Sequence, residues 1–370
     1  MKIDTVKNLR NLALGIFTGA LLLYPWAGLF YWVFPVISAS LLIYSLNNRG
    51  HHITFEDCSI PFILGLIFII SAISAGGFYM ATKRSIYFLL LLVNYTLILN
   101  FYRTNESYKF LQGIMIIIFV ESFILLCQHY LYGEGITSET SNKNVIGGLV
   151  FLLTLISSKI FIQSKSNSSL IFFFSSLLML ILSFSAKYLI MSSLILLYLM
   201  FRMSRFKVIL ILGISYFLLI LNAEFSLKIQ RLSNSMFYKN LAVIDNDISI
   251  GRHAVNNRIE LIKDGLALYS QGNLIIGEGL EYERFVLGTY SHNSYVSTLI
   301  GGGMLGTVVF LLYIYSLLHK SLEAKIIEHK YFNLLLLLCL LVVLMAHRYY
   351  DSTSLMLAFS LFYYDTTNCK

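Results

Sequence analysis

Long apolar runs separated by short polar connections make up most of the sequence, and they limit the folds that the chain can adopt. A helix needs about 20 apolar residues to cross roughly 30 Å of hydrocarbon, and in lipid every backbone polar group must be satisfied within its own segment. The runs lack the period-two alternation of a β-barrel. We therefore predict an all-α polytopic membrane protein with about 12 transmembrane helices. The predicted spans are 11–25, 28–46, 60–77, 86–102, 110–131, 145–163, 169–186, 188–202, 206–223, 292–318, 331–347 and 352–364.

Lysine and arginine are distributed unevenly between alternate connections, which predicts the orientation of the chain. A cytoplasmic N-terminus places these basic residues inside: Lys2, Lys7, Arg10, Arg49, Arg103, Lys109, Lys165, Arg202, Arg205, Lys207, Lys320, Lys325, Lys330 and Lys370. The short outer connections carry only Lys83, Arg84, Lys143, Lys187 and Arg348. The positive-inside rule therefore predicts that both termini are cytoplasmic. Membrane topology accounts for the net charge of +8, so we expect no nucleic-acid partner.

The predicted spans and the long polar segment between them divide the chain into three parts. We expect an N-terminal transmembrane bundle of about nine helices in 1–223, a long outer loop in 224–290 and about three C-terminal transmembrane helices in 291–370. Within the loop, Asn257 and Glu260 have the spacing of a capping box, which predicts a helix beginning at Arg258. Apolar residues then follow at helical spacing at Ile259, Ile262, Leu266 and Tyr269. We expect this amphipathic helix to lie on the outer membrane surface, followed by a flexible turn at the sequence GEG.

The sequence YSHNSYVSTLIGGGMLG, residues 290–306, places His292 and Asn293 at the predicted outer entrance of a span. Helical spacing from His292 predicts one stripe containing Tyr295, Val296, Leu299, Gly303 and Gly306. Gly302 and Gly306 also form a GxxxG motif, which lets another helix or a lipid chain come close. An interfacial histidine beside a helix-packing motif is the alternative interpretation, since isolated GxxxG matches are common.

Three cations fall on the outer face of the predicted topology. Lys187 interrupts SFSAKYLIM, Arg258 begins the amphipathic helix, and Arg348 lies in the short turn AHRYYDS. Together with His292 they predict a basic pocket for a phosphate-bearing lipid. Structural alternatives are a snorkelling lysine, a phospholipid headgroup contact and an Arg348–Asp351 ion pair.

Acidic residues supply two further candidates. Glu121 lies in the middle of the apolar sequence IIIFVESFILL, where a carboxyl group predicts either a functional site or a protonated or paired structural residue. Asp245 and Asp247 form a D-x-D pair, a spacing that metal-bound sugar nucleotides use, but we favour the interpretation that they are solvated acidic residues of the loop. The four cysteines form no CxxC, so we predict neither a metal site nor a disulfide framework.

With these motifs in order, the chain resembles the O-antigen ligase/polymerase superfamily of bacterial envelope glycan enzymes. The likeness covers most of the chain in architecture and residues 250–306 in motifs. The matching elements are Arg258 in NNRIELIKDG, Gly277 and Gly279 in IIGEG, and His292, Asn293, Gly303 and Gly306 in HNSYVSTLIGGGMLG. NKNVIGG at 142–148 resembles the family's asparagine-bearing start of a middle span. The family's Ser-Arg-Gly turn is replaced by Ser185, Ala186 and Lys187, so the charge is kept and the bidentate fork is lost.

The resemblance implies an inner-membrane glycosyltransferase whose active site is periplasmic. Family members act on glycans carried by a polyprenyl diphosphate, either joining repeat units or transferring the chain to lipid A-core. Chain length and the SHNSY form of the motif favour the polymerase. The expected partners are an undecaprenyl-diphosphate-linked oligosaccharide as donor and acceptor, membrane lipids and a chain-length regulator protein. No cofactor or metal is expected.

The chemistry assigns roles to particular residues. A neutral imidazole suits the general base that an acceptor hydroxyl needs, and cations offset the charge of the leaving diphosphate. The candidate catalytic residues are His292, Arg258 and Lys187, and the candidate substrate-binding residues are Asn293, Arg348, Gly277, Gly279 and Gly303. Two alternatives come from other classes. A lipid-linked oligosaccharide transporter would also explain Glu121, and a non-catalytic scaffold predicts that His292 is dispensable.

Overall fold

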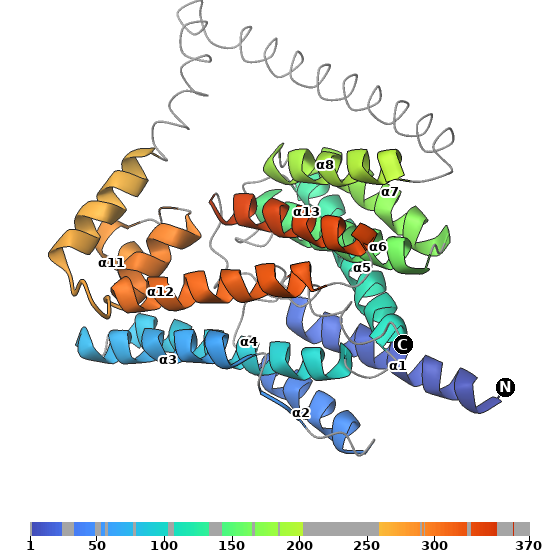
Figure 1. The fold of residues 1–370 in the computed structure, drawn as a ribbon, viewed down its shortest axis with the longest axis horizontal. Helices are drawn as coiled ribbons and strands as arrows, with labels where there is room; N and C mark the ends of the chain where they lie inside the picture. The colour runs from blue at the N-terminus through green and yellow to red at the C-terminus, as the bar shows by residue number, and fades with distance from the viewer. Residues whose placement is uncertain are drawn as a thin grey trace, which may run out of the picture.

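The computed structural model describes residues 2–23, 33–48, 53–55, 58–76, 79–102, 107–132, 143–164, 167–183, 186–202, 259–288, 291, 293–323, 327–345 and 358. All regular structure in these residues is helical (Figure 1). The first eight helices are α1 (Lys2–Leu23), α2 (Val33–Asn47), α3 (Ser59–Ser74), α4 (Tyr79–Tyr102), α5 (Ser107–Tyr132), α6 (Lys143–Ser164), α7 (Asn167–Leu182) and α8 (Ala186–Arg202). A helical segment at 259–271 follows, and then α11 (Tyr282–Leu287), α12 (Ser294–Leu322) and α13 (Ile327–Leu344).

The helices agree with most of the predicted spans that the structure describes. Several begin earlier than predicted, as α1 and α4 do, because polar residues continue a helix without adding to its apolar pattern. The predicted spans 206–223 and 352–364 lie outside the described residues, apart from Ala358. The all-helical prediction is therefore confirmed for the described part of the chain.

Three of the described helices are long and apolar enough to cross a membrane. These segments are Thr82–Phe101 in α4, Lys109–Gln128 in α5 and Ser294–Leu322 in α12. Other helices are apolar but shorter, including α2, α3 and α7. These findings are compatible with a polytopic membrane protein, and the number of twelve spans stays a prediction.

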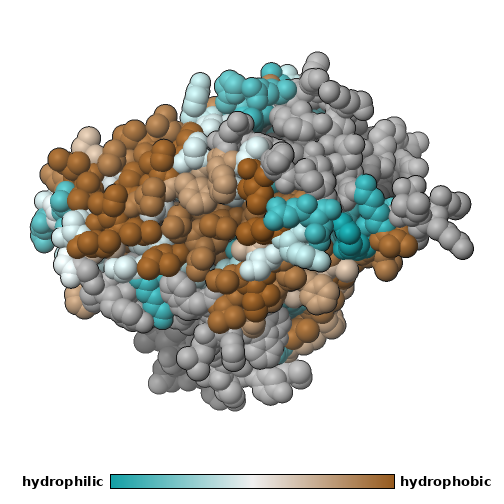
Figure 2. Space-filling model, turned by 90° about the horizontal axis from the view of Figure 1, so that it is seen from below, coloured by the Kyte–Doolittle hydropathy of each residue, from teal (hydrophilic) through white to brown (hydrophobic). Residues whose placement is uncertain are grey.

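The outward faces of these helices are apolar, as expected of surfaces in contact with lipid. On α3 the exposed large side chains are Ile63, Leu66, Ile70 and Ile73. On α12 they are Met304, Leu305, Val308, Leu311, Leu312, Tyr315, Leu318 and Leu322. Figure 2 shows a broad hydrophobic surface on the face that carries α3. Soluble proteins rarely expose contiguous apolar patches of more than a few hundred Å², so this surface supports membrane association.

Glycines let α1 and α5 approach each other backbone to backbone. A Cβ atom added to Gly15 would lie 2.0 Å from the carbonyl oxygen of Phe110, and one added to Gly19 would lie 2.2 Å from Ile117. The contacts advance in the same direction along both helices, so α1 and α5 run parallel. These helices correspond to the first and fifth predicted spans. If each span crosses the membrane in the direction opposite to the one before it, the first and fifth must run parallel, as they do.

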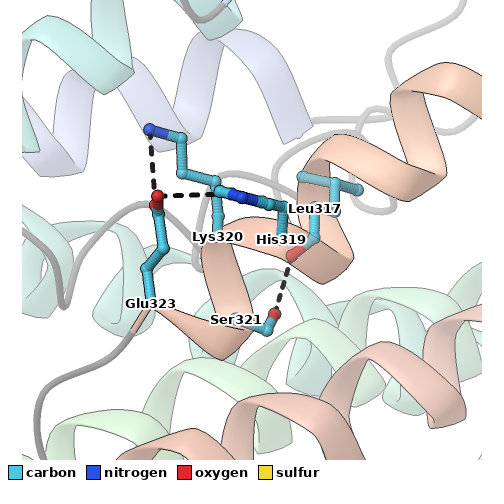
Figure 3. A network of polar contacts seen from close by, with 5 residues as sticks. All are labelled: Leu317, His319, Lys320, Ser321 and Glu323. Carbon is cyan, nitrogen blue, oxygen red and sulfur yellow. Dashed lines mark hydrogen bonds and ion pairs between the residues drawn. The ribbon is translucent and has the colours of Figure 1, made fainter.

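Charged side chains gather at the C-terminal end of α12 (Figure 3). Glu323 Oε1 lies 3.2 Å from His319 Nδ1, and Glu323 Oε2 lies 4.0 Å from Lys320 Nζ. The neighbouring Ser321 hydroxyl donates to the Leu317 carbonyl at 2.8 Å. In the predicted topology this end of α12 lies inside, and that orientation stays a prediction.

Candidate functional site

The chain segment 274–279 is hydrogen-bonded into a break in α12. In a continuous helix, the Met304 and Leu305 N–H groups would donate to the carbonyls four residues earlier. Here they donate to the Leu274 and Ile275 carbonyls, at 2.9 and 3.0 Å. This leaves the Ile300 and Gly301 carbonyls without their helical partners. They accept the N–H groups of Glu278 and Gly279, both at 2.9 Å. The inserted segment therefore satisfies all four backbone groups that the break would otherwise leave unpaired.

Glycines are required at the points where the two chains meet. Gly303 has φ 62° and ψ −160°, a conformation that is essentially restricted to glycine. A Cβ atom there would lie 2.4 Å from the Ile275 carbonyl oxygen, and one on Gly277 (φ 73°) would lie 2.5 Å from the Gly303 nitrogen. A Cβ atom on Gly279 (φ 88°) would meet Ala72 of α3 at 2.7 Å. The predicted flexible turn is therefore wrong, because this turn is paired with α12 and packed against α3.

The GxxxG motif is occupied by a helix. A Cβ atom on Gly302 would lie 3.1 Å from the Phe68 ring, and one on Gly306 would lie 3.6 Å from Ile67. Both neighbours belong to α3, which runs antiparallel to α12. Of the two occupants expected from sequence, a helix or a lipid chain, the helix is found. The space beside these glycines that a lipid chain could have taken is filled by the Phe68 and Ile67 side chains.

The break folds the first part of α12 back toward the second part. The rings of Tyr295 and Phe310 lie 5.8 Å apart, although fifteen residues of straight helix would separate them by about 22 Å. The predicted continuous stripe from His292 through Gly303 to Gly306 is therefore wrong, because residues on either side of Gly303 do not share one helix axis. Only the part of α12 after Gly303 continues as a straight apolar helix.

Asn293 caps the first turn of α12. Its side-chain oxygen accepts the N–H groups of Tyr295 and Val296, at 3.0 and 3.1 Å. Its amide nitrogen donates to the Met345 carbonyl at the end of α13, at 3.2 Å. An N-cap of this kind contributes about 0.5–2 kcal/mol. Asn293 thus has a structural role that the sequence did not indicate, and its predicted contact with substrate stays a prediction.

Sequence reasoning missed Glu283, a buried carboxylate. It makes hydrogen bonds to residues on both sides of His292 in the sequence. Glu283 of α11 is 3% exposed, and it accepts the Ser291 N–H and the Ser297 hydroxyl, the latter at 2.8 Å. Two residues earlier, Glu281 is also buried and lies 3.3 Å from the Arg84 guanidinium of α4. No spacing rule connects 283 with 291 or 281 with 84, so only the fold could reveal these contacts.

A helix covers 259–271, where the capping box and the apolar repeat predicted one. It packs on the start of α12, where Leu268 forms a small buried cluster with Val296 and Ile300, and Ile262 lies at the edge of that cluster. Gly265 permits this approach, since a Cβ atom there would lie 2.8 Å from Val296. Ile259 and Leu266, which we predicted to share the apolar face, are exposed.

The start of α8 lies level with the end of α13. The Met191 carbonyl is 3.7 Å from Cys339 Sγ, and the rings of Tyr198 and Phe332 are 5.4 Å apart. From the first pair to the second, the residue number rises on α8 and falls by the same amount on α13, so the two helices are antiparallel. The same register places the backbone of Lys187, in the first turn of α8, opposite Val343. Lys187 therefore lies inside α8 and not in the connection between α7 and α8.

These contacts bring the segments that carry the predicted site residues to one end of the bundle. Arg258, His292 and Arg348 themselves, and the D-x-D residues Asp245 and Asp247, lie outside the described residues. Their described neighbours do converge: the helix 259–271 packs on the start of α12, and α12 is tied by Asn293 to Met345.

No protein-family model and no curated protein matches the chain significantly.

Proposed function

We propose that this protein is a polymerase that joins polyprenyl-diphosphate-linked oligosaccharide repeat units on the periplasmic face of the bacterial inner membrane. The observation that carries the proposal is the convergence of four chain segments at the start of α12. They are the helix that follows Arg258, the residues Ser291 and Asn293 on either side of His292, the end of α13 four residues before Arg348, and the first turn of α8 with Lys187, which lies opposite the end of α13. A shared basic phosphate site would explain why each of these segments carries a cation or a histidine.

The proposed reaction uses the four residues together. The acceptor sugar hydroxyl attacks the anomeric carbon of the donor while the bond from that carbon to the diphosphate oxygen breaks. His292 takes the hydroxyl proton, because an unperturbed imidazole, with a pKa of about 6.5, is available as a base near neutral pH. Arg258 binds the leaving diphosphate with paired N–H donors, and Lys187 and Arg348 add positive charge. The diphosphate oxygen takes the bonding electron pair, and the diphosphate leaves still attached to its carrier lipid.

The apolar faces of α3 and α12 support a membrane location for this chemistry. The exposed apolar part of α12 runs from its junction with segment 274–279 to the charged cluster around Glu323, and the start of α12 folds back beside that junction. A polyprenyl diphosphate has its phosphates at the membrane surface and its chain in the hydrocarbon. A basic site at the end of an apolar helix face therefore fits both parts of that substrate.

A deletion strain distinguishes polymerase from ligase. Loss of a polymerase leaves a single repeat unit on the lipid A-core or on the capsule carrier, whereas loss of a ligase leaves long chains on the carrier lipid. We expect the first banding pattern on a polysaccharide gel. Long carrier-linked chains would assign the protein to the ligases, and an unchanged pattern would refute both assignments.

A lipid-linked oligosaccharide transporter is the second candidate, and Glu121 is the observation that favours it. This residue of α5 is 2% exposed, and neither carboxyl oxygen has a hydrogen-bond partner among the described residues. A carboxyl group at the centre of a membrane helix costs about 2.5–3.5 kcal/mol, so such residues often serve ion or proton pathways. Purified protein in detergent separates the two candidates, because an enzyme extends chains there and a transporter has no membrane across which to act.

A further inference from the structure

Glu283 makes hydrogen bonds to both sides of the loop that carries His292. One carboxylate oxygen accepts the N–H of Ser291, the residue before His292, and the other accepts the hydroxyl of Ser297 in the first turn of α12, at 2.8 Å. The carboxylate is only 3% exposed. A buried carboxylate is costly unless its oxygens are hydrogen-bonded, and an ionised carboxylate is an acceptor only, as both contacts require.

The short helix α11 that carries Glu283 is itself fixed at its start. Glu281 adopts a left-handed backbone conformation, with φ 75°, which is uncommon for a residue other than glycine. Its carboxylate is buried and pairs with Arg84 of α4. Just before it, the Gly279 N–H donates to the Gly301 carbonyl in α12. The start of α11 is therefore attached to both α4 and α12, so Glu283 reaches the loop from a rigid support.

The residue after His292 is held as well. Asn293 caps α12 through the N–H groups of Tyr295 and Val296, and it donates to Met345. In the sequence His292 therefore stands between Ser291, whose N–H is bound by Glu283, and Asn293, whose side chain makes three hydrogen bonds. Rigid flanking residues reduce the conformations open to the residue between them, and catalytic groups depend on support of that kind.

We propose that Glu283 is a positioning residue for His292. It binds the Ser291 N–H before His292 and the Ser297 hydroxyl after it, and these two contacts limit the positions that the base can take. This inference rests on the proposed function, because it presumes that His292 is the base. Glu283 does not itself touch substrate in this scheme.

The test compares Glu283→Gln, Glu283→Ala and Ser297→Ala in the purified full-length protein, with undecaprenyl-diphosphate-linked repeat units as substrate. Glutamine keeps one acceptor for the Ser291 N–H but loses the charge, and charge-assisted hydrogen bonds are about twice as strong as neutral ones. We expect kcat to fall about tenfold for Glu283→Gln and for Ser297→Ala. For Glu283→Ala we expect a fall of about a hundredfold, since a misplacement of about 1 Å can cost that much.

The decisive readout is the separation of kcat from KM. A positioning residue lowers kcat while KM for the lipid-linked substrate and the melting temperature in detergent stay near the wild-type values. Glu278→Gln is the matched control, because Glu278 also accepts a backbone N–H, that of Asn273, in the neighbouring turn at 2.7 Å. We expect its kcat to stay near the wild-type value.

Three results would overturn the proposal. If folded Glu283→Gln and Ser297→Ala proteins keep the wild-type kcat while His292→Ala is inactive, the inference fails and the proposed function stands. If kcat falls only in proportion to folded protein, Glu283 is merely structural. If His292→Ala retains full activity, the proposed function itself fails, and the positioning role fails with it.

Discussion

The substitution Gly303→Ala tests the junction on which the geometry of the site depends. The methyl group would enter the space between α12 and the inserted segment 274–279, where the Ile275 carbonyl oxygen lies 2.4 Å from the new Cβ position. Alanine also disfavours the backbone conformation found there, φ 62° and ψ −160°. Both effects act against the four hydrogen bonds that join the two chains.

The expected cost follows from these two terms. A backbone conformation that is essentially restricted to glycine costs about 1–3 kcal/mol. Each of the four interchain hydrogen bonds contributes about 0.5–1.5 kcal/mol net, and the methyl group forces at least the nearest pair to lengthen or break. We therefore expect Gly303→Ala to lower the free energy of unfolding by about 3–5 kcal/mol.

Gly288→Ala is the matched control. Gly288 also has a positive φ, 69°, but a Cβ atom there would meet nothing within 4 Å. Only the backbone preference is lost, at about 1–2 kcal/mol. In heat-unfolding scans in detergent, Gly303→Ala should therefore melt well below Gly288→Ala. Faster hydrogen exchange at the Met304 and Leu305 amides should accompany that difference. Equal melting temperatures would show that segment 274–279 is not locked into the break, and the reasoning would be refuted.

Three further predictions concern topology and charge. In a protein freed of its native cysteines, Arg284→Cys should react with an impermeant thiol reagent on intact spheroplasts and Glu323→Cys only after lysis; the reverse pattern would invert the topology. Arg258→Lys should lower polymerisation about ten- to a hundredfold with normal membrane insertion, because a bidentate charged contact is worth roughly 1.5–3 kcal/mol; wild-type rates in Arg258→Ala would remove Arg258 from the site. Lys187→Arg should retain polymerisation in the same assay and Lys187→Met should lose it, whereas equal activity would leave Lys187 as a snorkelling residue.

Much of the fold could be predicted because membrane helices follow from local composition. The apolar runs located α1 to α8 and α13, and the capping box with its apolar repeat located the helix 259–271. Each of these signals lies within one segment of chain. Their boundaries shifted where polar residues extend a helix, as at the start of α4.

The break in α12 could not be predicted in the same way. The sequence predicts a helix-packing GxxxG at Gly302 and Gly306, and both glycines do pack against α3. At Gly303, however, the backbone leaves the helix because segment 274–279 supplies alternative hydrogen-bond partners. A local pattern cannot show which distant carbonyl replaces a helical one, so the fold-back of α12 depends on tertiary contacts.

The same limit applies to the site. Sequence patterns selected residues with suitable chemistry, such as His292 and Arg258, but they gave no reason to single out Glu283 or Arg84. Those two residues matter through contacts with Ser291 and Glu281, and such contacts exist only after folding. Asn293 shows the converse, since a residue chosen for substrate binding proved to be the cap of α12.

The most direct test of the central claim is chain extension by purified His292→Ala and His292→Gln proteins supplied with undecaprenyl-diphosphate-linked repeat units. A general base typically contributes about a hundred- to ten-thousandfold to rate, so His292→Ala should make no long chains while folding normally. Glutamine keeps a hydrogen bond but cannot take a proton near neutral pH, so His292→Gln should fail equally. A clear fraction of activity in His292→Gln would reduce His292 to a binding residue. Normal chains from both variants would contradict the account.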